Sequence, residues 1–493
     1  MLLRSDFILL ALGRISTAFI AVASIRIMTG LLTPSDYGQW VLLVAFQSFC
    51  ALFLINPVDQ HVFRKTHAWW DNGTLFKKLR TYNLYITAVS VVVAITVIFW
   101  FQNTRTYDAK SFEIRLTAGL VVGLIVYLST WNVLLSFTLN MLGHRIQSVI
   151  WMVISALAGL LFSALLAYYY QSAVSWMIGQ VLGAIFGAIG ARHALHKLSA
   201  NSVPEVTHHS NEKFLDIATV RKFCIPLAVA TGFMWVQNTG YRFWAGESWG
   251  VAELGIFAIG LGIAAQLSAI VETLAVQFLY PYFSRRISDS KSDAATSSAL
   301  SDLINVLAPI YAVWAGFNAA CASALLEIIT DQRYHAAATF VVVGAMIEFL
   351  RCLTNLWSNT ARAVQRTKGL ILPYALGAII VCTGVVVGSV QDMKLLEFAF
   401  ILVFAGLVTC ITMALQMKRI LPTSVDKKRL TLSVIFMLIC FLYSIFRETS
   451  YPSLSQNLLH LLVGAIVAFA MIVVVTWRNT ASDRLLAVVL RSR

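Results

Sequence analysis

The sequence predicts an all-α polytopic membrane protein with about fourteen transmembrane helices. Of its 493 residues, 59% are hydrophobic and 12% are charged, whereas soluble domains carry about 25% charged residues. Apolar runs of about twenty residues recur along the whole chain, and a helix of that length spans a hydrocarbon layer of roughly 30 Å. The alternation of apolar and polar residues that marks membrane-spanning strands is absent, which argues against a β-barrel.

Each predicted helix is an apolar stretch bounded by polar or charged residues. The predicted spans are 7–30, 37–56, 81–102, 115–140, 147–170, 174–196, 219–243, 251–277, 300–325, 336–361, 369–389, 395–417, 430–446 and 457–477. The first stretch is too long for the apolar part of a signal peptide and contains Arg14. It also lacks a clear small-residue cleavage site, so we expect a retained helix.

The placement of the basic residues predicts the orientation. With the amino terminus in the cytoplasm, the cytoplasmic segments hold 27 of the 37 Lys and Arg residues. This bias fits the positive-inside rule with both termini cytoplasmic. The net charge of +14 does not indicate a nucleic-acid partner, because the basic residues form no clustered face.

Polar interruptions divide the helices into groups that we interpret as two pseudo-symmetric six-helix lobes and two C-terminal helices. The interruption rich in His, Asn, Ser and Glu after helix six marks the boundary between the lobes. The predicted parts are an N-lobe over 1–200, a cytoplasmic linker over 201–216, a C-lobe over 217–417, a basic cytoplasmic loop over 418–429, two final helices within 430–477 and a cytoplasmic tail over 478–493.

A long-period repeat supports this division. Arg26 precedes Gly38 by twelve residues, and Arg242 precedes Gly255 by thirteen. In both places an acid, a bulky residue and the glycine open the next apolar stretch. Six helices in each half give both halves the same starting side. The repeat is therefore parallel, related by an axis along the membrane normal, and a working site is expected between the halves.

The same two halves correspond again further along the chain. The predicted fourth helix contains Asn132 and ends near Arg145, and the predicted tenth helix contains Asn355 and ends near Lys368. Asn132 and Asn355 are 223 residues apart (355 − 132), and this offset also pairs Arg145 with Lys368.

These motifs carry a family resemblance. The run Thr29-Gly-Leu-Leu-Thr-Pro-Ser-Asp-Tyr-Gly38 resembles the first helix junction of Wzx-type polysaccharide and O-antigen flippases. These flippases belong to the MOP (multidrug/oligosaccharidyl-lipid/polysaccharide) exporter superfamily. Ala252–Phe257 and Pro281–Arg285 resemble the matching region of the second lobe. Many relatives have an aspartate just before the arginine of helix seven, where this chain reads Thr239-Gly-Tyr-Arg242.

The resemblance implies a flippase rather than an enzyme. Its expected substrate is a polyprenyl-diphosphate-linked oligosaccharide, which is moved from the cytoplasmic to the outer leaflet of a bacterial inner membrane by alternating access. Membrane lipids are expected partners, and a polysaccharide polymerase and a chain-length regulator are further candidates. No nucleic acid and no cofactor are expected. The nine histidines and seven cysteines show no metal-ligand spacing, so we expect no metal site.

The predicted seventh helix carries the clearest candidate substrate site. Its polar and aromatic residues are spaced four, three and four apart, which places them within about 60° on an α-helix. We predict that they line a cavity in which a sugar stacks on the tryptophan and an anion meets the arginine. The alternative is a packing tryptophan beside an arginine that extends to the lipid headgroups. The residues are Thr231, Trp235, Asn238 and Arg242.

The first helix carries two further arginine candidates. Arg14 shares a face with Thr17, Ala21 and Ser24, and this face either borders a cavity or packs against a neighbouring helix. Arg26 lies about 18 Å further along the helix and about 120° around it. Both arginines are candidate substrate ligands, and interfacial anchoring is the alternative for Arg26.

Acidic residues within the membrane are candidate ion-coupling sites, because charge at that depth is costly. Glu348 and Arg351 lie three residues apart in helix ten and are expected to pair. We favour a purely structural role for this pair; the alternative is that Glu348, or Glu272 in helix eight, is a candidate proton or sodium site. For Gln237 and Gln266 we favour hydrogen bonds between helices.

Two other functions remain as alternatives. A small-molecule antiporter related to the multidrug (MATE) branch needs a buried acid more than it needs arginines. A membrane glycosyltransferase or polymerase needs catalytic acids on large outside loops, and the predicted outside loops are short.

Overall fold

The computed structural model describes the backbone of residues 2–103, 112–201, 214–216, 220–279, 292–364, 366–446 and 453–477. These residues form helices joined by short turns, and no strand occurs among them. Every one of the fourteen predicted spans coincides with helix in the structure. The predicted all-α membrane fold is therefore confirmed.

Twelve of the helices are long and apolar enough to cross a membrane in the described residues. The other two predicted spans are helical as well. The first contributes the shorter apolar stretch Ile15–Leu31. The seventh consists of α-helical segments and the two π-helical segments Val220–Cys224 and Val236–Gly240.

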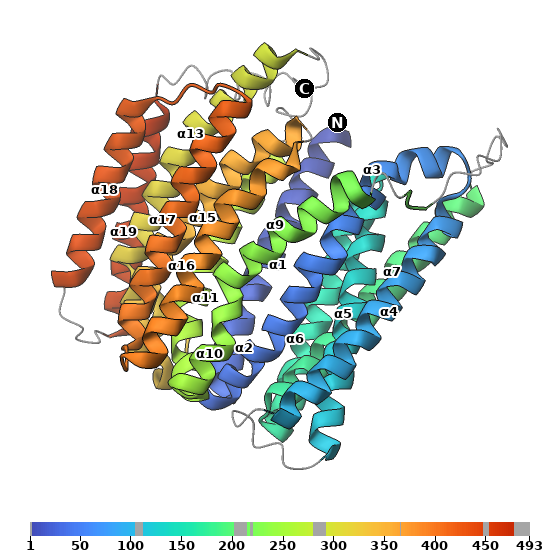
Figure 1. Cartoon of the computed structure of the whole chain (residues 1–493), viewed down its shortest axis with the longest axis horizontal. Coiled ribbons are helices and arrows are strands. Elements are labelled where there is room, and N and C mark those ends of the chain that lie inside the picture. Colours follow the sequence, from blue (N-terminus) through green and yellow to red (C-terminus); the bar gives the residue numbers. More distant parts are fainter. Residues whose placement is uncertain are drawn as a thin grey trace. The chain divides into compact units, whose positions relative to one another are not determined.

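The chain forms two compact units, and the first consists of Met1–Trp235 and Arg242–Gly255. Helices α4 to α7 lie side by side in this unit, and α1 packs on α6 (Figure 1). The helices are α1 (Leu2–Leu31), α2 (Pro34–Phe49), η1 (Cys50–Ile55), α3 (Asn56–Asp71), α4 (Leu75–Asn103), α5 (Phe112–Met141), α6 (Arg145–Tyr170), α7 (Ala173–Asn201), η2 (Val220–Cys224), α9 (Ile225–Trp235) and most of α10 (Tyr241–Ser248).

The second unit consists of Val236–Tyr241 and Ile256–Arg493. In it, α13 packs against α15, α18 and α19, and α17 packs against α15 and α16. The elements are η3 (Val236–Gly240), most of α11 (Val251–Phe278), α13 (Asp293–Ala320), α14 (Ala322–Ile329), η4 (Gln332–Ala337), α15 (Ala338–Ala363), η5 (Thr367–Leu370), α16 (Ile371–Val390), α17 (Leu395–Ile420), α18 (Lys427–Phe446) and α19 (Leu454–Thr476).

The division between compact units falls later in the chain than the predicted linker. The chain passes between the units within residues 235–256, whereas most of the linker over 201–216 lies outside the described residues. The predicted tail over 478–493 and the motif over 280–286 also lie outside them. The division into six-helix lobes stays a prediction.

The first repeat motif begins a helix for an identifiable reason. The hydroxyl of Thr33 accepts a hydrogen bond from the backbone N–H of Asp36, and the Asp36 carboxylate accepts one from the Thr33 N–H. This reciprocal capping box satisfies two N–H groups that the first turn leaves without partners. Pro34 fits the first turn because no hydrogen bond is required of its nitrogen there.

Small residues allow α6 and α7 to pack closely. A Cβ on Gly179 would lie 2.1 Å from the backbone nitrogen of Ser163. A Cβ on Gly183 would lie 2.4 Å from the Cα of Gly159. These contacts leave no room for a larger side chain, so the two backbones approach directly.

Candidate functional sites

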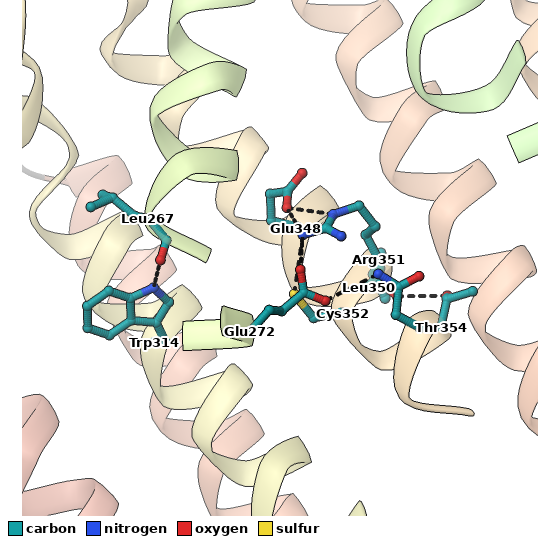
Figure 2. A network of polar contacts seen from close by, with 9 residues as sticks. Leu267, Glu272, Trp314, Glu348, Leu350, Arg351, Cys352 and Thr354 are labelled. Atoms are coloured by element: carbon teal, nitrogen blue, oxygen red, sulfur yellow. Dashed lines mark hydrogen bonds and ion pairs between the residues drawn. The ribbon is translucent and has the colours of Figure 1, made fainter. Parts of the chain in front are cut away.

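A charged cluster joins α11 and α15 within the second unit (Figure 2). The Nε of Arg351 donates to Glu348 Oε2 at 2.7 Å, and its Nη2 donates to Glu272 Oε2 at 2.7 Å. Asn355 donates from Nδ2 to the second oxygen of Glu272 at 3.2 Å. One guanidinium therefore holds two carboxylates, and the predicted Glu348–Arg351 pair is confirmed.

The cluster is partly enclosed. The exposed fractions of the side chains are 27% for Arg351, 23% for Glu272 and 10% for Glu348. With all three groups ionised, the cluster carries one net negative charge. A carboxylate pair that shares one cation in a membrane interior can take up a proton or a small cation to become neutral. Both acids were candidates from the sequence, and in the structure Glu272 and Glu348 both bind Arg351.

Helix seven departs from the α-helical geometry that was assumed in placing Thr231, Trp235, Asn238 and Arg242 on one face. We call this predicted face the stripe. Residues Val236–Gly240 form a π-helical turn, η3, between α9 and α10. A π-turn has i→i+5 hydrogen bonds, so residues beyond it are rotated relative to an α-helix. The stripe is also divided, because Asn238 belongs to the second unit while Thr231, Trp235 and Arg242 belong to the first. That the four residues share one face stays a prediction.

Two residues of the stripe bond to neighbouring helices within the first unit. The hydroxyl of Thr231 donates to the carbonyl of Leu52 at 2.7 Å. The indole nitrogen of Trp235 donates to the carbonyl of Ala45 and to the hydroxyl of Ser48, each at 3.1 Å. Both side chains thus join α9 to α2 and η1.

Aromatic contacts give Trp235 a packing role. Its ring meets the edge of Phe49 at a centroid distance of 4.9 Å, and Phe243 lies 6.1 Å away. Edge-to-face rings at these separations attract one another beyond their burial. The bonds and the rings together favour the packing interpretation of this tryptophan.

The three arginine candidates differ in environment. Arg242 is half-buried on α10, and its charge acts on the buried Tyr37. Arg26 is exposed near the end of α1. The side chain of Arg14 lies outside the described residues, although its backbone is part of α1.

The face of α1 that carries Thr17, Ala21 and Ser24 borders a cavity in the first unit. Thr17, Ala21 and Ser24 all line a space of about 360 Å³. Residues of α2, α5, α6 and α7 complete the lining, among them Gln47 and Asn132. These other contributors were not predicted from the sequence, because no spacing within one helix shows which uncharged residues of five helices meet.

Of the two glutamines, Gln237 has the predicted interhelical role. Its side-chain oxygen accepts a hydrogen bond from the hydroxyl of Thr409 at 3.2 Å, inside the second unit. Gln266 is half-buried on α11, and its role stays a prediction.

The helices define a multi-pass membrane protein. The model of a family described as polysaccharide biosynthesis protein matches residues 27–339. The chain belongs to that family, which confirms the resemblance seen in its motifs. No curated protein matches the sequence.

The chain is similar in fold to solved structures of a lipid flippase and of multidrug and MOP superfamily transporters. A lipid II flippase, MurJ, in an inward closed conformation has a TM-score of 0.62 at 11% identity, covering 95% of this chain and 98% of that one. An inward-facing multidrug resistance MATE transporter has 0.56 at 12% identity, covering 91% and 98%. A MOP superfamily transporter from Pyrococcus furiosus has 0.53 at 12% identity, covering 84% and 93%.

Proposed function

We propose that the protein flips a polyprenyl-diphosphate-linked oligosaccharide from the cytoplasmic to the outer leaflet of a bacterial inner membrane, with both of its own termini in the cytoplasm. The main support for this proposal is the match to the polysaccharide biosynthesis family over residues 27–339. The likeness in fold to a lipid II flippase supports it. A polysaccharide polymerase and a chain-length regulator are the proposed downstream partners.

The transport problem suits a chain with polar groups at membrane depth. A sugar headgroup cannot cross hydrocarbon with its hydroxyls unsatisfied, and the two lobes rock about a central site to move it. Arginines suit the diphosphate because they form strong charge-assisted bonds to phosphate oxygens. We assign that role to Arg242, Arg26 and Arg14, with Asn238 bonding a sugar hydroxyl and Thr231 and Trp235 holding helix seven in place.

The membrane potential can drive this export. The diphosphate carries about two negative charges, and an inside-negative potential of roughly 100 mV is worth about 2.3 kcal/mol per charge. Outward movement therefore gains about 4–5 kcal/mol. A proton or sodium ion returning inward would bind at Glu272 and Glu348, whose charges Arg351 only half neutralises.

A flipping assay in vesicles tests the proposal. The protein is reconstituted in liposomes with a fluorescent polyprenyl-diphosphate-linked oligosaccharide, and a membrane-impermeant quencher reports the leaflet of the label. We expect faster flipping than in protein-free vesicles. Flipping no faster than in those vesicles would overturn the proposal. Varying pH, sodium and potential then identifies the coupling.

Arginine variants locate the substrate site. Arg242→Ala is expected to slow flipping at least tenfold with an unchanged yield of folded protein, because a charge-assisted bond is worth about 1.5–3 kcal/mol. Arg333→Ala is the matched control, since Arg333 pairs with Asp331 at an exposed position where an ion pair contributes little. Wild-type rates in Arg242→Ala would remove Arg242 from the site.

A second candidate, exchange of a small organic cation, is favoured by the excess negative charge at Glu272, Glu348 and Arg351. The same vesicles loaded with a fluorescent cation such as ethidium separate the two functions. Release of ethidium that depends on Glu272, without flipping of the lipid, would favour the antiporter.

A further inference from the structure

The cavity of the first unit is an open pocket formed by helices of one compact unit. Residues of α1, α2, α5, α6 and α7 line its volume of about 360 Å³, which falls within the range of roughly 300–1,000 Å³ found for ligand pockets. All of its lining residues belong to the unit formed by Met1–Trp235 and Arg242–Gly255. It is therefore distinct from the charged cluster of α11 and α15.

The lining combines polar and apolar side chains. Among the sixteen lining residues whose side chains the structure describes, eight carry a hydroxyl or a side-chain amide, and none is acidic, basic or aromatic. Phosphate is bound in proteins by arginine and lysine, and hard cations by carboxylates. This chemistry suits neither an anion nor a cation, and it suits an uncharged polyhydroxyl compound.

Four of the polar side chains have no hydrogen-bond partner in the part of the chain that the structure describes. They are Ser24 of α1, Gln47 of α2, Ser129 of α5 and Gln180 of α7. All four are half-buried. Unpaired amides and hydroxyls are costly where no lipid group can bond them, so a polar occupant is expected among them.

Other polar groups in the same cavity, unlike these four, form hydrogen bonds between helices. The amide nitrogen of Asn132 donates to Ser155 at 2.9 Å, and the Ser155 hydroxyl donates to the carbonyl of Gly183 at 2.9 Å. The hydroxyl of Ser163 donates to the carbonyl of Trp176 at 2.7 Å. These hydrogen bonds hold α5, α6 and α7 together. Of the four side chains without a bond, Ser129 and Gln180 lie on α5 and α7, and Ser24 and Gln47 lie on α1 and α2.

The sequence repeat gives an independent reason to regard the cavity as specialised. The offset of 223 residues that pairs Asn132 with Asn355 also pairs Ile125, which lines the cavity, with Glu348 (348 − 223) and Leu128 with Arg351 (351 − 223). The equivalent helices thus carry a neutral polar cavity in one half and a charged cluster in the other.

We propose that this cavity binds an uncharged sugar unit through the hydroxyls and amides of Ser24, Gln47, Ser129 and Gln180. An amide both donates and accepts, so Gln47 and Gln180 can satisfy both needs of a sugar hydroxyl. The identity of the natural ligand as the glycan of the flipped lipid rests on the proposed function, whereas binding of a neutral sugar does not.

Cysteine protection tests the site directly. Ser129→Cys is labelled with a water-soluble thiol reagent in the purified full-length protein, and mass spectrometry identifies the labelled peptide against the seven native cysteines. The probes are a polyprenyl-diphosphate-linked neutral disaccharide, polyprenyl diphosphate alone and free maltose. We expect at least fivefold slower labelling with the disaccharide lipid and with saturating maltose, and no change with polyprenyl diphosphate.

Two other results would overturn the inference. Equal protection by polyprenyl diphosphate would assign the cavity to lipid or phosphate, and absence of labelling or of protection would leave it a hydrated packing defect. If wild-type protein flips the lipid but the thiol of Ser129→Cys is not protected, the inference fails while the proposed function stands. If maltose protects but no lipid is flipped, the inference stands and the proposed function fails.

Affinity variants add a second readout. Gln47→Leu and Gln180→Leu are each expected to weaken sugar binding about tenfold, measured from ligand-dependent thermal stabilisation, because each removes bonds that only the ligand completes. Thr96→Val is the control, since Thr96 is exposed on α4 and bonds its own helix. Unchanged affinity in both glutamine variants contradicts the proposal.

Discussion

Gly38 and Gly255, the two glycines of the sequence repeat, each pack closely against the helix that contains the other. A Cβ on Gly38 would lie 2.0 Å from the carbonyl oxygen of Val251, and one on Gly255 would lie 2.0 Å from that of Pro34. Each glycine thus packs against the first turn of the helix that contains the other. The contact between the two motifs is therefore reciprocal.

Alanine at Gly38 should therefore destabilise the protein. Its methyl group would meet backbone atoms, which cannot rotate away, so we expect a loss of about 1–3 kcal/mol and a lower melting temperature in detergent. Gly30→Ala is the control, because nothing lies within 4 Å of a Cβ there. Equal melting temperatures for the two variants would contradict the contact.

The repeat shows what sequence can and cannot predict. The two motifs predicted equivalent helix starts, and Thr33, Pro34 and Asp36 form the cap that such residues favour. Their mutual contact was not predictable, because a match between two motifs states likeness and not proximity. Likewise the apolar spacing predicted helix seven, but the π-turn at Val236–Gly240 depends on tertiary packing that propensity does not encode.

Opposed glycines on α6 and α7 should respond differently to the same change. Gly183→Ala places a methyl group 2.4 Å from the Gly159 backbone, whereas Gly159→Ala places one 3.8 Å from Gly183, an ordinary contact. We expect Gly183→Ala to lose about 1–3 kcal/mol and Gly159→Ala to fold as the wild type does. Thermal unfolding followed by size-exclusion chromatography measures both, and similar losses in the two variants would show that the packing is wrong.

Trp235 should matter more for stability than for substrate. Trp235→Phe keeps a ring beside Phe49 and removes the bonds to Ala45 and Ser48, so a loss of about 1 kcal/mol is expected. Trp235→Ala removes the ring, and we expect about 2–4 kcal/mol because the site is half-buried. Flipping per folded molecule should stay within about twofold in Trp235→Phe. A much slower rate with unchanged stability would instead place the tryptophan against the sugar.

Candidate site residues were predictable where charge marks them and not where it is absent. Glu272, Glu348 and Arg351 stand out as ionisable groups at membrane depth, and the spacing of the last two predicted their pairing. That Glu272 joins the same arginine requires the packing of α11 on α15, across 79 residues of sequence. Gln47 and Gln180 carry no charge, and only the assembled helices show that both reach one cavity.

For the charged cluster, we expect a triple substitution to reduce the stability of the protein less than a single substitution does. Arg351→Met leaves Glu272 and Glu348 without their shared cation, so we expect a loss of about 1–3 kcal/mol, moderated by the partial exposure of the group. Adding Glu272→Gln and Glu348→Gln removes both stranded charges while the shapes are kept.

We therefore expect the triple variant to recover most of the lost stability, because an ion pair replaced as a whole costs less than one broken in half. Melting temperatures of the wild type, the single variant and the triple variant measure this. The triple variant should still lose any dependence of flipping on pH or sodium, since no ionisable side chain of the cluster remains. A triple variant less stable than Arg351→Met would show that the carboxylates hold the helices by contacts other than this arginine.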